Sequence, residues 1–239
     1  MSFMSVPEIL YDDDGLIAIN KPSGFLSHPN PGRTREPVTF PGGYDFNARA
    51  FDAPGGKIFL LHRLDLETSG VLMAVRDSEL ARRMREMFPA KKIRKFYTAL
   101  LQGAPREGRK GRWLDHLEKA SGRQRATVQV VRNRKPNAEM LFQVARVFPV
   151  IRLTLVEIEL ITGFTHQIRV QAASRHRPIL GDPLYGSFKA NREMKKRFGL
   201  DRMFLHASKV EFRHPVTGES IVIKAPLPED LKEVIHKLR

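Results

Sequence analysis

The chain has 239 residues, 41% of them hydrophobic, which is enough for one large domain or two small lobes around a shared core. Lysine and arginine number 41 against 26 acidic residues, and the formal charge of +15 favours a polyanionic partner such as nucleic acid. Because the chain has no cysteine, its sequence excludes disulfides, cysteine-bound zinc and thiol nucleophiles.

No stretch approaches the roughly 20 apolar residues of a membrane span, and residues 1–10 lack the regions of a signal peptide. We therefore expect a cytoplasmic protein without a membrane anchor. The histidines are not at the spacing of metal ligands, and the glycines form neither a P-loop nor a dinucleotide fingerprint. We expect no metal and no cofactor, and a monomer in the absence of any dimer signal.

The N-terminal part of the chain is typical of short strands. Apolar runs at 9–11 and 16–19 flank an acidic turn and predict a β-hairpin. Residues 29–57 hold many Pro, Gly and Asn residues and predict one long loop. Buried strands are predicted at 57–61 and 69–75.

The clearest predicted helix follows directly. Apolar residues recur with helical spacing from Leu80 to Phe88, which predicts a helix over 78–88. We expect Ser78 to cap its start and Pro89 to end it.

The remainder of the chain mixes strands and helices. A strand is predicted at 95–101, and the basic residues 104–125, with little periodicity, predict an excursion from the core. A change of register at Leu155-Val156 predicts a bulge or a strand that is buried on both sides. Further strands are expected at 126–132, 139–148, 151–160, 204–212 and 220–224, and helices at 165–175, 191–198 and 228–238. Without regular βα alternation, the pattern predicts an α+β fold in a single domain, residues 1–239.

The most distinctive segment is His62–Gly70. In an extended conformation, Asp65 would share a side with Arg63 and Glu67, close to a reversal at Ser69-Gly70. A carboxylate at such a position is either half of a structural ion pair with Arg63 or a catalytic group near a loop. The segment alone leaves both interpretations open.

A second candidate site lies at the start of the helix predicted from Thr165. Thr165 can cap this helix, and His166 and Arg169 then share one face near its N-terminus. Backbone N–H groups and cations at a helix start suit an anion such as phosphate. An ordinary basic surface helix explains the same pattern.

Two further segments carry little information when taken alone, since Tyr97 is typical of a core strand and Gly181–Gly186 of two turns. The order in which all the motifs occur is more specific. The series is Asn20–Gly24, His62–Gly70, Lys95–Tyr97, Gly163–Arg169, Gly181–Gly186 and Leu205–Ala207. This series resembles the RluA-type pseudouridine synthases over about residues 9–228.

The resemblance implies an RNA pseudouridine synthase that isomerises a specific uridine in tRNA or rRNA without a cofactor. It implies that Asp65 is the catalytic carboxylate, that Tyr97 packs against the target base and that Arg169 pairs with the aspartate. Leu205 would lie beneath the base, and Arg63 would help to hold the flipped nucleotide.

Other residues in these motifs are expected to contact the substrate: Asn20, Lys21, His62 and His166. The expected partner is RNA rather than DNA. The family fold is a bent, mostly antiparallel mixed sheet, flanked by helices, with a central catalytic cleft. That description agrees with the α+β pattern.

The chain departs from the family pattern at two positions. Phe164 stands where the family usually has Arg, and Gln171 where it usually has His, so we expect differences in RNA-backbone contact or local packing. The chain also starts at the catalytic region, without room for the small N-terminal RNA-binding domain of many relatives. Substrate choice would then come from the catalytic domain, including residues 29–57 and 104–125.

Two other functions fit some of the residues. One is an RNA-binding module of the same fold without activity. The other is a glycosidase that uses Asp65 and Glu67 as acid and nucleophile, since residues two apart on a strand project together at roughly 7 Å. The aromatic share of 8%, with one Trp, disfavours sugar-binding subsites.

Overall fold

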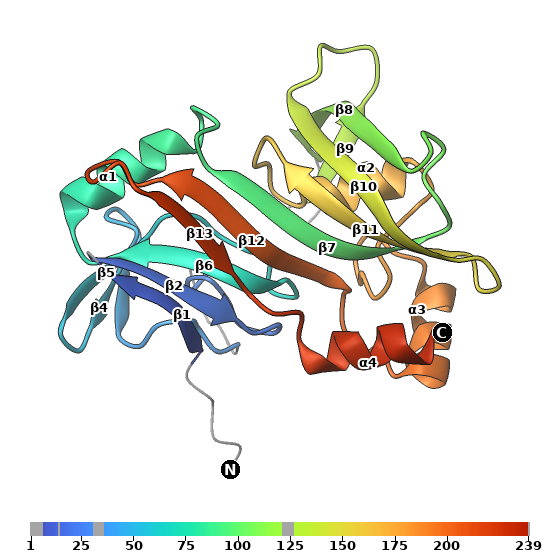
Figure 1. The fold of residues 1–239 in the computed structure, drawn as a ribbon, viewed down its shortest axis with the longest axis horizontal. Helices are drawn as coiled ribbons and strands as arrows, with labels where there is room; N and C mark the ends of the chain where they lie inside the picture. The colour runs from blue at the N-terminus through green and yellow to red at the C-terminus, as the bar shows by residue number, and fades with distance from the viewer. Residues whose placement is uncertain (1–6, 14, 31–35, 121–126, 239) are drawn as a thin grey trace. The chain divides into compact units, whose positions relative to one another are not determined.

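A computed structural model of the chain describes residues 7–13, 15–30, 36–120 and 127–238. It divides into two compact units, here called the first and the second unit. The first unit comprises Met1–Ile93 and Ala207–Pro226, and the second comprises Arg94–His206 and Leu227–Arg239. Both units contain strands and helices, which confirms the predicted α+β class (Figure 1).

The first unit is built on the predicted N-terminal hairpin. β1 (Glu8–Asp13) and β2 (Leu16–Lys21) pair antiparallel, as the acidic turn predicted. β2 pairs antiparallel with β6 (Ser69–Val75), and β6 pairs with β5 (Gly56–Leu60) (Figure 1). Every residue of β6 is buried, so this strand forms the centre of the unit.

Helix α1 (Ser78–Met87) covers the apolar core of the first unit, into which it buries the following residues: Leu80, Ala81, Met84 and Met87. The prediction that Ser78 caps this helix was wrong. The cap is Asp77, whose carboxylate accepts a hydrogen bond of 2.7 Å from the Leu80 backbone N–H. A carboxylate at this position also interacts favourably with the helix dipole.

The prediction of one long loop over residues 29–57 was wrong for its second half. Strands β3 (Gly43–Asp45) and β4 (Ala50–Ala53) lie there, and β4 continues the sheet by pairing with β5. Both strands are too short to show an alternating pattern. The Asp45 carboxylate closes the turn between them by accepting two backbone N–H groups. Residues 31–35 lie outside the described part of the chain.

The C-terminal hairpin was predicted correctly. β12 (Leu205–Arg213) and β13 (Ser220–Lys224) pair antiparallel. The residues of β12 from Ala207 onward belong to the first unit, and there β12 passes close to Gly70. Gly70 has a φ of 113°, and a Cβ added to it would lie 2.2 Å from the Ala207 carbonyl oxygen.

We therefore expect Gly70→Ala to lower the free energy of unfolding by about 3 kcal/mol or more, since it adds backbone strain and a clash with the main chain. Urea unfolding measures this change. Gly218→Ala is the matched control, because Gly218 also has a positive φ of 75° but nothing lies within 4 Å of its added Cβ. Equal losses in the two variants would contradict the role of the close approach.

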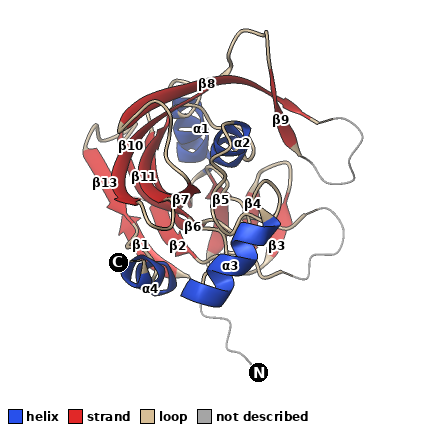
Figure 2. Ribbon diagram, turned by 90° about the vertical axis from the view of Figure 1, so that its right-hand side faces the viewer, coloured by secondary structure: helices blue, strands red, loops and turns tan. Residues whose placement is uncertain are grey.

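The second unit is a five-stranded antiparallel arrangement (Figure 2). Its pairing order is β7 (Arg94–Gln102), β11 (Leu153–Leu160), β10 (Ala138–Phe148), β8 (Lys110–Lys119) and β9 (Val128–Val131). The predicted bulge is present. Its extra residue lies on β10 at Ala145, opposite the register change predicted at Leu155-Val156.

The prediction that residues 104–125 form a loop excursion from the core was wrong for residues 110–119, which form strand β8 (Lys110–Lys119). Trp113 and Leu117 are the buried apolar residues of this strand, and charged side chains surround them. So few apolar residues do not produce a recognisable alternation. Residues 121–126 lie outside the described part of the chain.

Three helices belong to the second unit. α2 (Gln167–Ser174) packs through Val170 against the apolar side of β8, β9 and β10 (Figure 2). α3 (Phe188–Phe198) begins earlier than predicted and ends at Gly199 as expected. α4 (Glu229–Lys237) follows Pro228, in agreement with the prediction.

Candidate active site

Asp65 lies in a tight turn of the first unit rather than in an extended strand. The Thr68 backbone N–H donates to the Asp65 carbonyl at 3.1 Å, and Leu66 and Glu67 form the turn. The expectation that Asp65 shares a strand face with Arg63 and Glu67 was therefore wrong. The strand geometry on which the glycosidase interpretation depends is absent from this described segment.

The backbone of this turn is held on its C-terminal side by the segment that follows β2. The Leu66 carbonyl accepts hydrogen bonds from Gly24 N at 2.8 Å and from Lys21 Nζ at 3.2 Å. The Ser23 hydroxyl donates to the Glu67 carbonyl at 2.8 Å. These bonds join residues far apart in sequence and hold the turn in one conformation.

The N-terminal side of the turn is held by Ser27. Its hydroxyl donates to the Leu64 carbonyl and accepts from the Leu64 backbone N–H, both at 2.9 Å. Thr39 in turn donates to the Ser27 carbonyl at 3.0 Å. The Asp65 side chain, between these two anchors, is half-buried. A carboxylate with a fixed backbone and partial access suits a reacting group.

Lys21, which was expected to contact the substrate, lies inside the first unit of the structure. Its side chain is fully buried, and besides Leu66 its ammonium donates to the carbonyls of Pro22 at 2.9 Å and Phe25 at 2.7 Å. Lys21 therefore shapes the Asp65 turn from beneath. Asn20 lies at the surface, where its amide donates to the Glu8 carboxylate at 3.1 Å.

His62 and Arg63 differ in exposure. The half-buried His62 accepts a hydrogen bond of 3.1 Å at Nε2 from the Met73 backbone N–H, which fixes its ring. Arg63 is exposed, and its guanidinium lies 3.3 Å from His28 Nε2. Within the described residues Arg63 makes no ion pair with Asp65, so the structural ion-pair interpretation of this segment is not supported.

The second unit contains a buried ion pair between Arg169 and Asp182. Two hydrogen bonds join them, from Arg169 Nε at 2.8 Å and from Nη2 at 2.9 Å, and the two side chains are 3% and 0% exposed. Burial acts to raise the pKa of Asp182. The hydrogen bond and charge of Arg169, with the backbone N–H groups of Tyr185 and Leu184, outweigh it and lower that pKa.

Tyr185 connects this ion pair to His166. The Arg169 guanidinium carbon lies 5.3 Å from the Tyr185 ring centroid. His166 Nδ1 is 3.1 Å from the Tyr185 hydroxyl, which also accepts from Val128 N at 2.9 Å. The expected anion site at the start of α2 was wrong in this respect, because Arg169 is buried and bound to a carboxylate rather than exposed for phosphate.

Tyr97 and Leu205 are both buried in the second unit. Tyr97 lies on β7 opposite Ile158 of β11, and Leu205 is the first residue of β12. Lys95 lies two residues before Tyr97 on the same side of the strand. The Lys95 ammonium donates to the Thr162 carbonyl at 3.4 Å.

Burial lowers the pKa of Lys95 to about 8. Between this value and the ordinary pKa of 10.5, the unfolded chain binds more protons than the folded one, so stability rises with pH. We expect the unfolding free energy of the wild type, relative to Lys95→Met, to rise by about 3 kcal/mol from pH 8 to 10.5. Urea unfolding across that range measures this, and a constant difference would contradict it.

Comparison with known proteins matches this chain to pseudouridine synthases. A family model described as RNA pseudouridylate synthase matches residues 15–174. The chain is 34% identical to the tRNA pseudouridine synthase C of Salmonella typhi, over 95% of this chain and 88% of that protein.

The chain belongs to the RNA pseudouridylate synthase family.

Two further proteins support the assignment. The ribosomal large subunit pseudouridine synthase C of Escherichia coli (strain K12) is 35% identical, over 97% of this chain and 70% of its own length. The solved structure of human RNA pseudouridylate synthase domain containing 4 matches with a TM-score of 0.72 and 26% identity, over 97% of this chain and 92% of that one. The chain is thus an RNA pseudouridine synthase, and RNA is its partner.

Helix α2 of this synthase begins differently from the prediction that Thr165 caps it. Thr165 does not cap the helix. The cap position is His166, which has a left-handed backbone with a φ of 54° and forms no capping bond through its side chain. Instead, Gln167 Oε1 accepts from Phe164 N at 3.1 Å and from the Thr162 hydroxyl at 2.8 Å. Phe164, one of the two departures from the family pattern, is 40% exposed.

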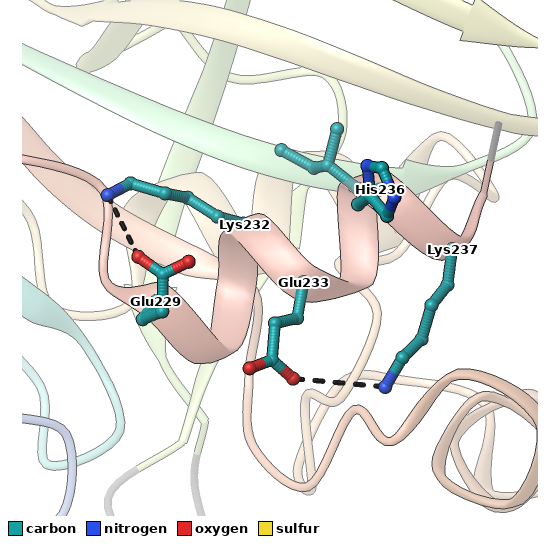
Figure 3. Close-up of a pocket in the computed structure, with 6 residues that line it drawn as sticks. Glu229, Lys232, Glu233, His236 and Lys237 are labelled. Atoms are coloured by element: carbon teal, nitrogen blue, oxygen red, sulfur yellow. Dashed lines mark hydrogen bonds and ion pairs between the residues drawn. The ribbon is translucent and has the colours of Figure 1, made fainter.

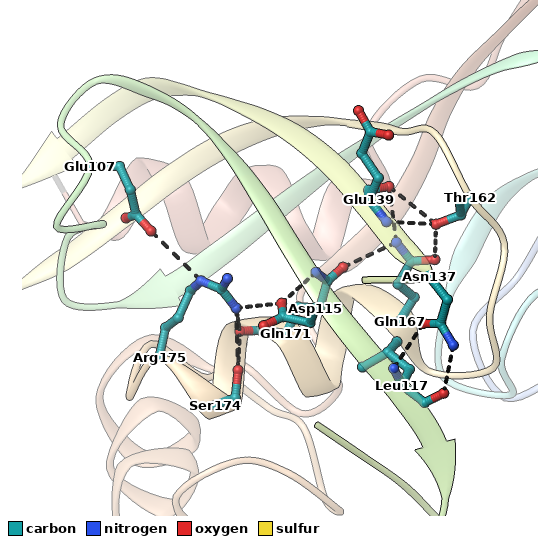
Figure 4. Close-up of polar contacts among 10 residues, drawn as sticks. All are labelled: Glu107, Asp115, Leu117, Asn137, Glu139, Thr162, Gln167, Gln171, Ser174 and Arg175. Carbon is teal, nitrogen blue, oxygen red and sulfur yellow. Dashed lines mark hydrogen bonds and ion pairs between the residues drawn. The ribbon is translucent and has the colours of Figure 1, made fainter. Parts of the chain in front are cut away.

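Gln171, the other departure, is part of a buried polar network (Figure 4). Its amide nitrogen donates to Asp115 on β8 at 2.6 Å, and its oxygen accepts from Gln167 at 3.0 Å. Arg175 donates to the same Asp115 carboxylate at 2.7 Å. Gln167 donates to the Glu139 carbonyl on β10 at 3.0 Å, so the network ties the start of α2 to β10 and its end to β8, with Arg169 on the helix between them.

The predicted site residues fall in both units. The first unit holds Asn20, Lys21, His62, Arg63 and Asp65, and the second holds Tyr97, His166, Arg169 and Leu205. Asp182 and Tyr185, which contact Arg169, were not among the predicted site residues. The sequence signal was the segment Gly181–Gly186, which was interpreted only as two turns.

The pocket beside α4 is a poor candidate for an RNA site. This shallow pocket contains two opposite-charge pairs, Lys232 with Glu229 at 3.1 Å and Lys237 with Glu233 at 3.8 Å (Figure 3). Such neutralised pairs do not suit a polyanion. Among the described residues, no acidic or histidine cluster could hold a metal ion, and no helix is long and apolar enough to cross a membrane.

Proposed function

We propose that this synthase converts specific uridines of tRNA or rRNA to pseudouridine, with Asp65 as its catalytic carboxylate. The observation that carries this assignment is the Asp65 turn. Hydrogen bonds from Ser27, Lys21 and Ser23 fix its backbone on both sides, while the Asp65 side chain keeps partial access to solvent. A reacting group needs both features, because it must be positioned in advance and reachable by substrate.

The reaction breaks the bond between N1 of uracil and C1′ of ribose and forms a bond between C5 and C1′. The C5 proton leaves and N1 gains a proton, so the change is an isomerisation without oxidation or reduction. An ionised Asp65 serves either as the nucleophile or as the base that removes a proton from the sugar. We propose that Arg169 favours the ionised form of Asp65 and helps to orient it.

Two residues of the second unit are proposed to contact the target base. The base must leave its stack to be modified, which costs a few kcal/mol. A stacking contact with an aromatic ring such as Tyr97 stabilises a base by about 1–3 kcal/mol. Leu205 would then support the base on its other side. Arg63, which is exposed beside the Asp65 turn, would contact the RNA backbone.

The relatives reported above are named for tRNA and for the ribosomal large subunit. We propose that either RNA is the substrate, and that the protein acts as a monomer in the cytoplasm. The test is tritium release from tRNA and from rRNA labelled at C5 of uridine, with the wild-type chain. Release from one pool identifies the substrate. Binding of both RNAs without release from either would favour the inactive RNA-binding module instead.

A further inference from the structure

Three aromatic rings of the first unit lie together outside the Asp65 turn, and we call His28, Tyr44 and Phe46 the ring cluster. His28 and Tyr44 stack, with centroids 5.0 Å apart and planes inclined by 10°. Phe46 stands nearly perpendicular to both, at 6.2 Å from His28 and 5.1 Å from Tyr44. The buried Phe51 supports Tyr44 from behind at 4.8 Å.

The outer part of the ring cluster is open to solvent. Phe46 is 49% exposed, and it lies in the turn between β3 and β4 that Asp45 closes. When another flat apolar surface covers a half-exposed aromatic ring that other rings support, the contact is stabilising. The ring cluster therefore has the form of a stacking platform.

His28 is neutral in this arrangement. Its Nδ1 lies 2.7 Å from the Pro29 carbonyl, which only accepts, and its Nε2 lies 3.3 Å from Arg63, which only donates. Nδ1 therefore carries the single proton. Burial lowers the pKa of His28, the bond to Pro29 partly opposes this, and the charges of Arg63 and Arg49 lower the pKa further.

Two cations lie beside the rings. Arg49 and Arg63 both act electrostatically on His28 and Tyr44, and among the described residues neither forms an ion pair with an acidic side chain. Unpaired guanidinium groups suit phosphate oxygens. Rings and cations together fit one nucleotide, with its base on the rings and its phosphates on the arginines.

The ring cluster is also anchored to the Asp65 turn. His28 directly follows Ser27, whose hydroxyl is bound twice to the Leu64 backbone, and Arg63 bonds to the His28 ring. These bonds fix the position of the ring cluster relative to the Asp65 turn. A base bound on the rings would therefore lie at a fixed position relative to the Asp65 carboxylate.

We propose that the ring cluster, with Arg49 and Arg63, binds an unpaired base that neighbours the target uridine in the substrate RNA. This subsite rests on the proposed function, since it would select the sequence or structure around the target. It assigns a recognition role to His28, Tyr44, Phe46 and Arg49, none of which lies in the motifs of the resemblance.

The test measures the dissociation constant of fluorescein-labelled decauridylate at several salt concentrations. Phe46→Leu removes the ring and keeps an apolar side chain, and we expect binding about tenfold weaker with an unchanged salt slope. Phe46→Tyr keeps the ring and should bind like the wild type. Arg49→Gln should reduce the slope of log affinity against log salt concentration by about 1, as expected for the loss of one phosphate contact.

Phe188→Leu is the matched control, because Phe188 is an aromatic residue with 79% exposure on α3 of the second unit. It should leave binding unchanged, and thermal unfolding should be the same for all Phe46 variants. Wild-type-like binding by Phe46→Leu, equal losses in Phe46→Leu and Phe188→Leu, or no binding of decauridylate by the wild type would each overturn the proposal.

The binding assay requires no turnover, so the two proposals fail separately. If the wild type releases no tritium but Phe46→Leu still weakens binding, the proposed function fails and the subsite stands. If the wild type is active and Phe46→Leu changes neither binding nor kcat/KM, the subsite alone fails.

Discussion

Asp65→Asn is expected to reduce the rate of pseudouridine formation at least about 10³-fold, the largest effect of any single substitution in this chain. The amide has nearly the shape of the carboxylate but is a far weaker nucleophile and base. The backbone bonds from Ser27 and Lys21 to the turn do not involve the Asp65 side chain, so the fold should persist. Steady-state kinetics on the RNA pool that the wild type modifies measures the loss.

Glu67→Gln is the matched control for Asp65→Asn. Glu67 is a half-buried carboxylate in the same turn, and its removal should change the rate no more than a few-fold. RNA affinity of Asp65→Asn should stay within about twofold of the wild type, because one charge among +15 contributes little to phosphate attraction. Normal turnover by Asp65→Asn, or an equal loss in Glu67→Gln, would contradict the assignment.

Asp182→Asn is expected to lower the free energy of unfolding by about 3–5 kcal/mol. The substitution removes the carboxylate charge that binds Arg169, whose side chain is only 3% exposed, through two hydrogen bonds. The amide oxygen of the new side chain can still accept the backbone N–H groups of Leu184 and Tyr185, so the loss reports mainly the missing charge of Asp182. Urea unfolding measures it.

Two further variants test whether the loss of stability in Asp182→Asn comes from the burial of the ion pair and from the charge of Arg169. The ion pair of Arg202 and Asp230 is partly exposed, with side chains 15% and 55% exposed. Asp230→Asn should therefore lower the free energy of unfolding by less than Asp182→Asn does, by about 1 kcal/mol. The double variant Arg169→Met/Asp182→Asn removes the buried charge and should recover part of the stability without recovering activity. A fully active double variant would contradict the proposed support of Asp65 by Arg169.

The elements that were predicted correctly carry their signal in contiguous sequence. The first hairpin has two apolar runs around an acidic turn, and α1 has apolar residues with helical spacing. The missed strands lack such a signal. β3 and β4 are too short to alternate, and β8 has Asp115 between its two buried apolar residues. That aspartate lies on the buried side because Arg175 and Gln171 bind it, and both come from a distant helix.

The sequence predicted which residues belong to the candidate site better than it predicted how those residues are arranged in space. The segment around Asp65 was recognised, but the turn at Leu66-Glu67 depends on bonds from residues 21–27, which local patterns do not show. Lys21 was expected to contact the substrate, whereas its buried ammonium donates to three backbone carbonyls. The pairing of Arg169 with Asp182 is a tertiary contact without any local signature.

The central claim is that this chain isomerises uridine in RNA. The most direct measurement is chromatographic analysis of the nucleosides from total tRNA and rRNA after incubation with excess wild-type protein. We expect uridine in one of these pools to fall and pseudouridine to rise by the same amount, without free uracil. No pseudouridine in either pool, or the release of free uracil in its place, would contradict it.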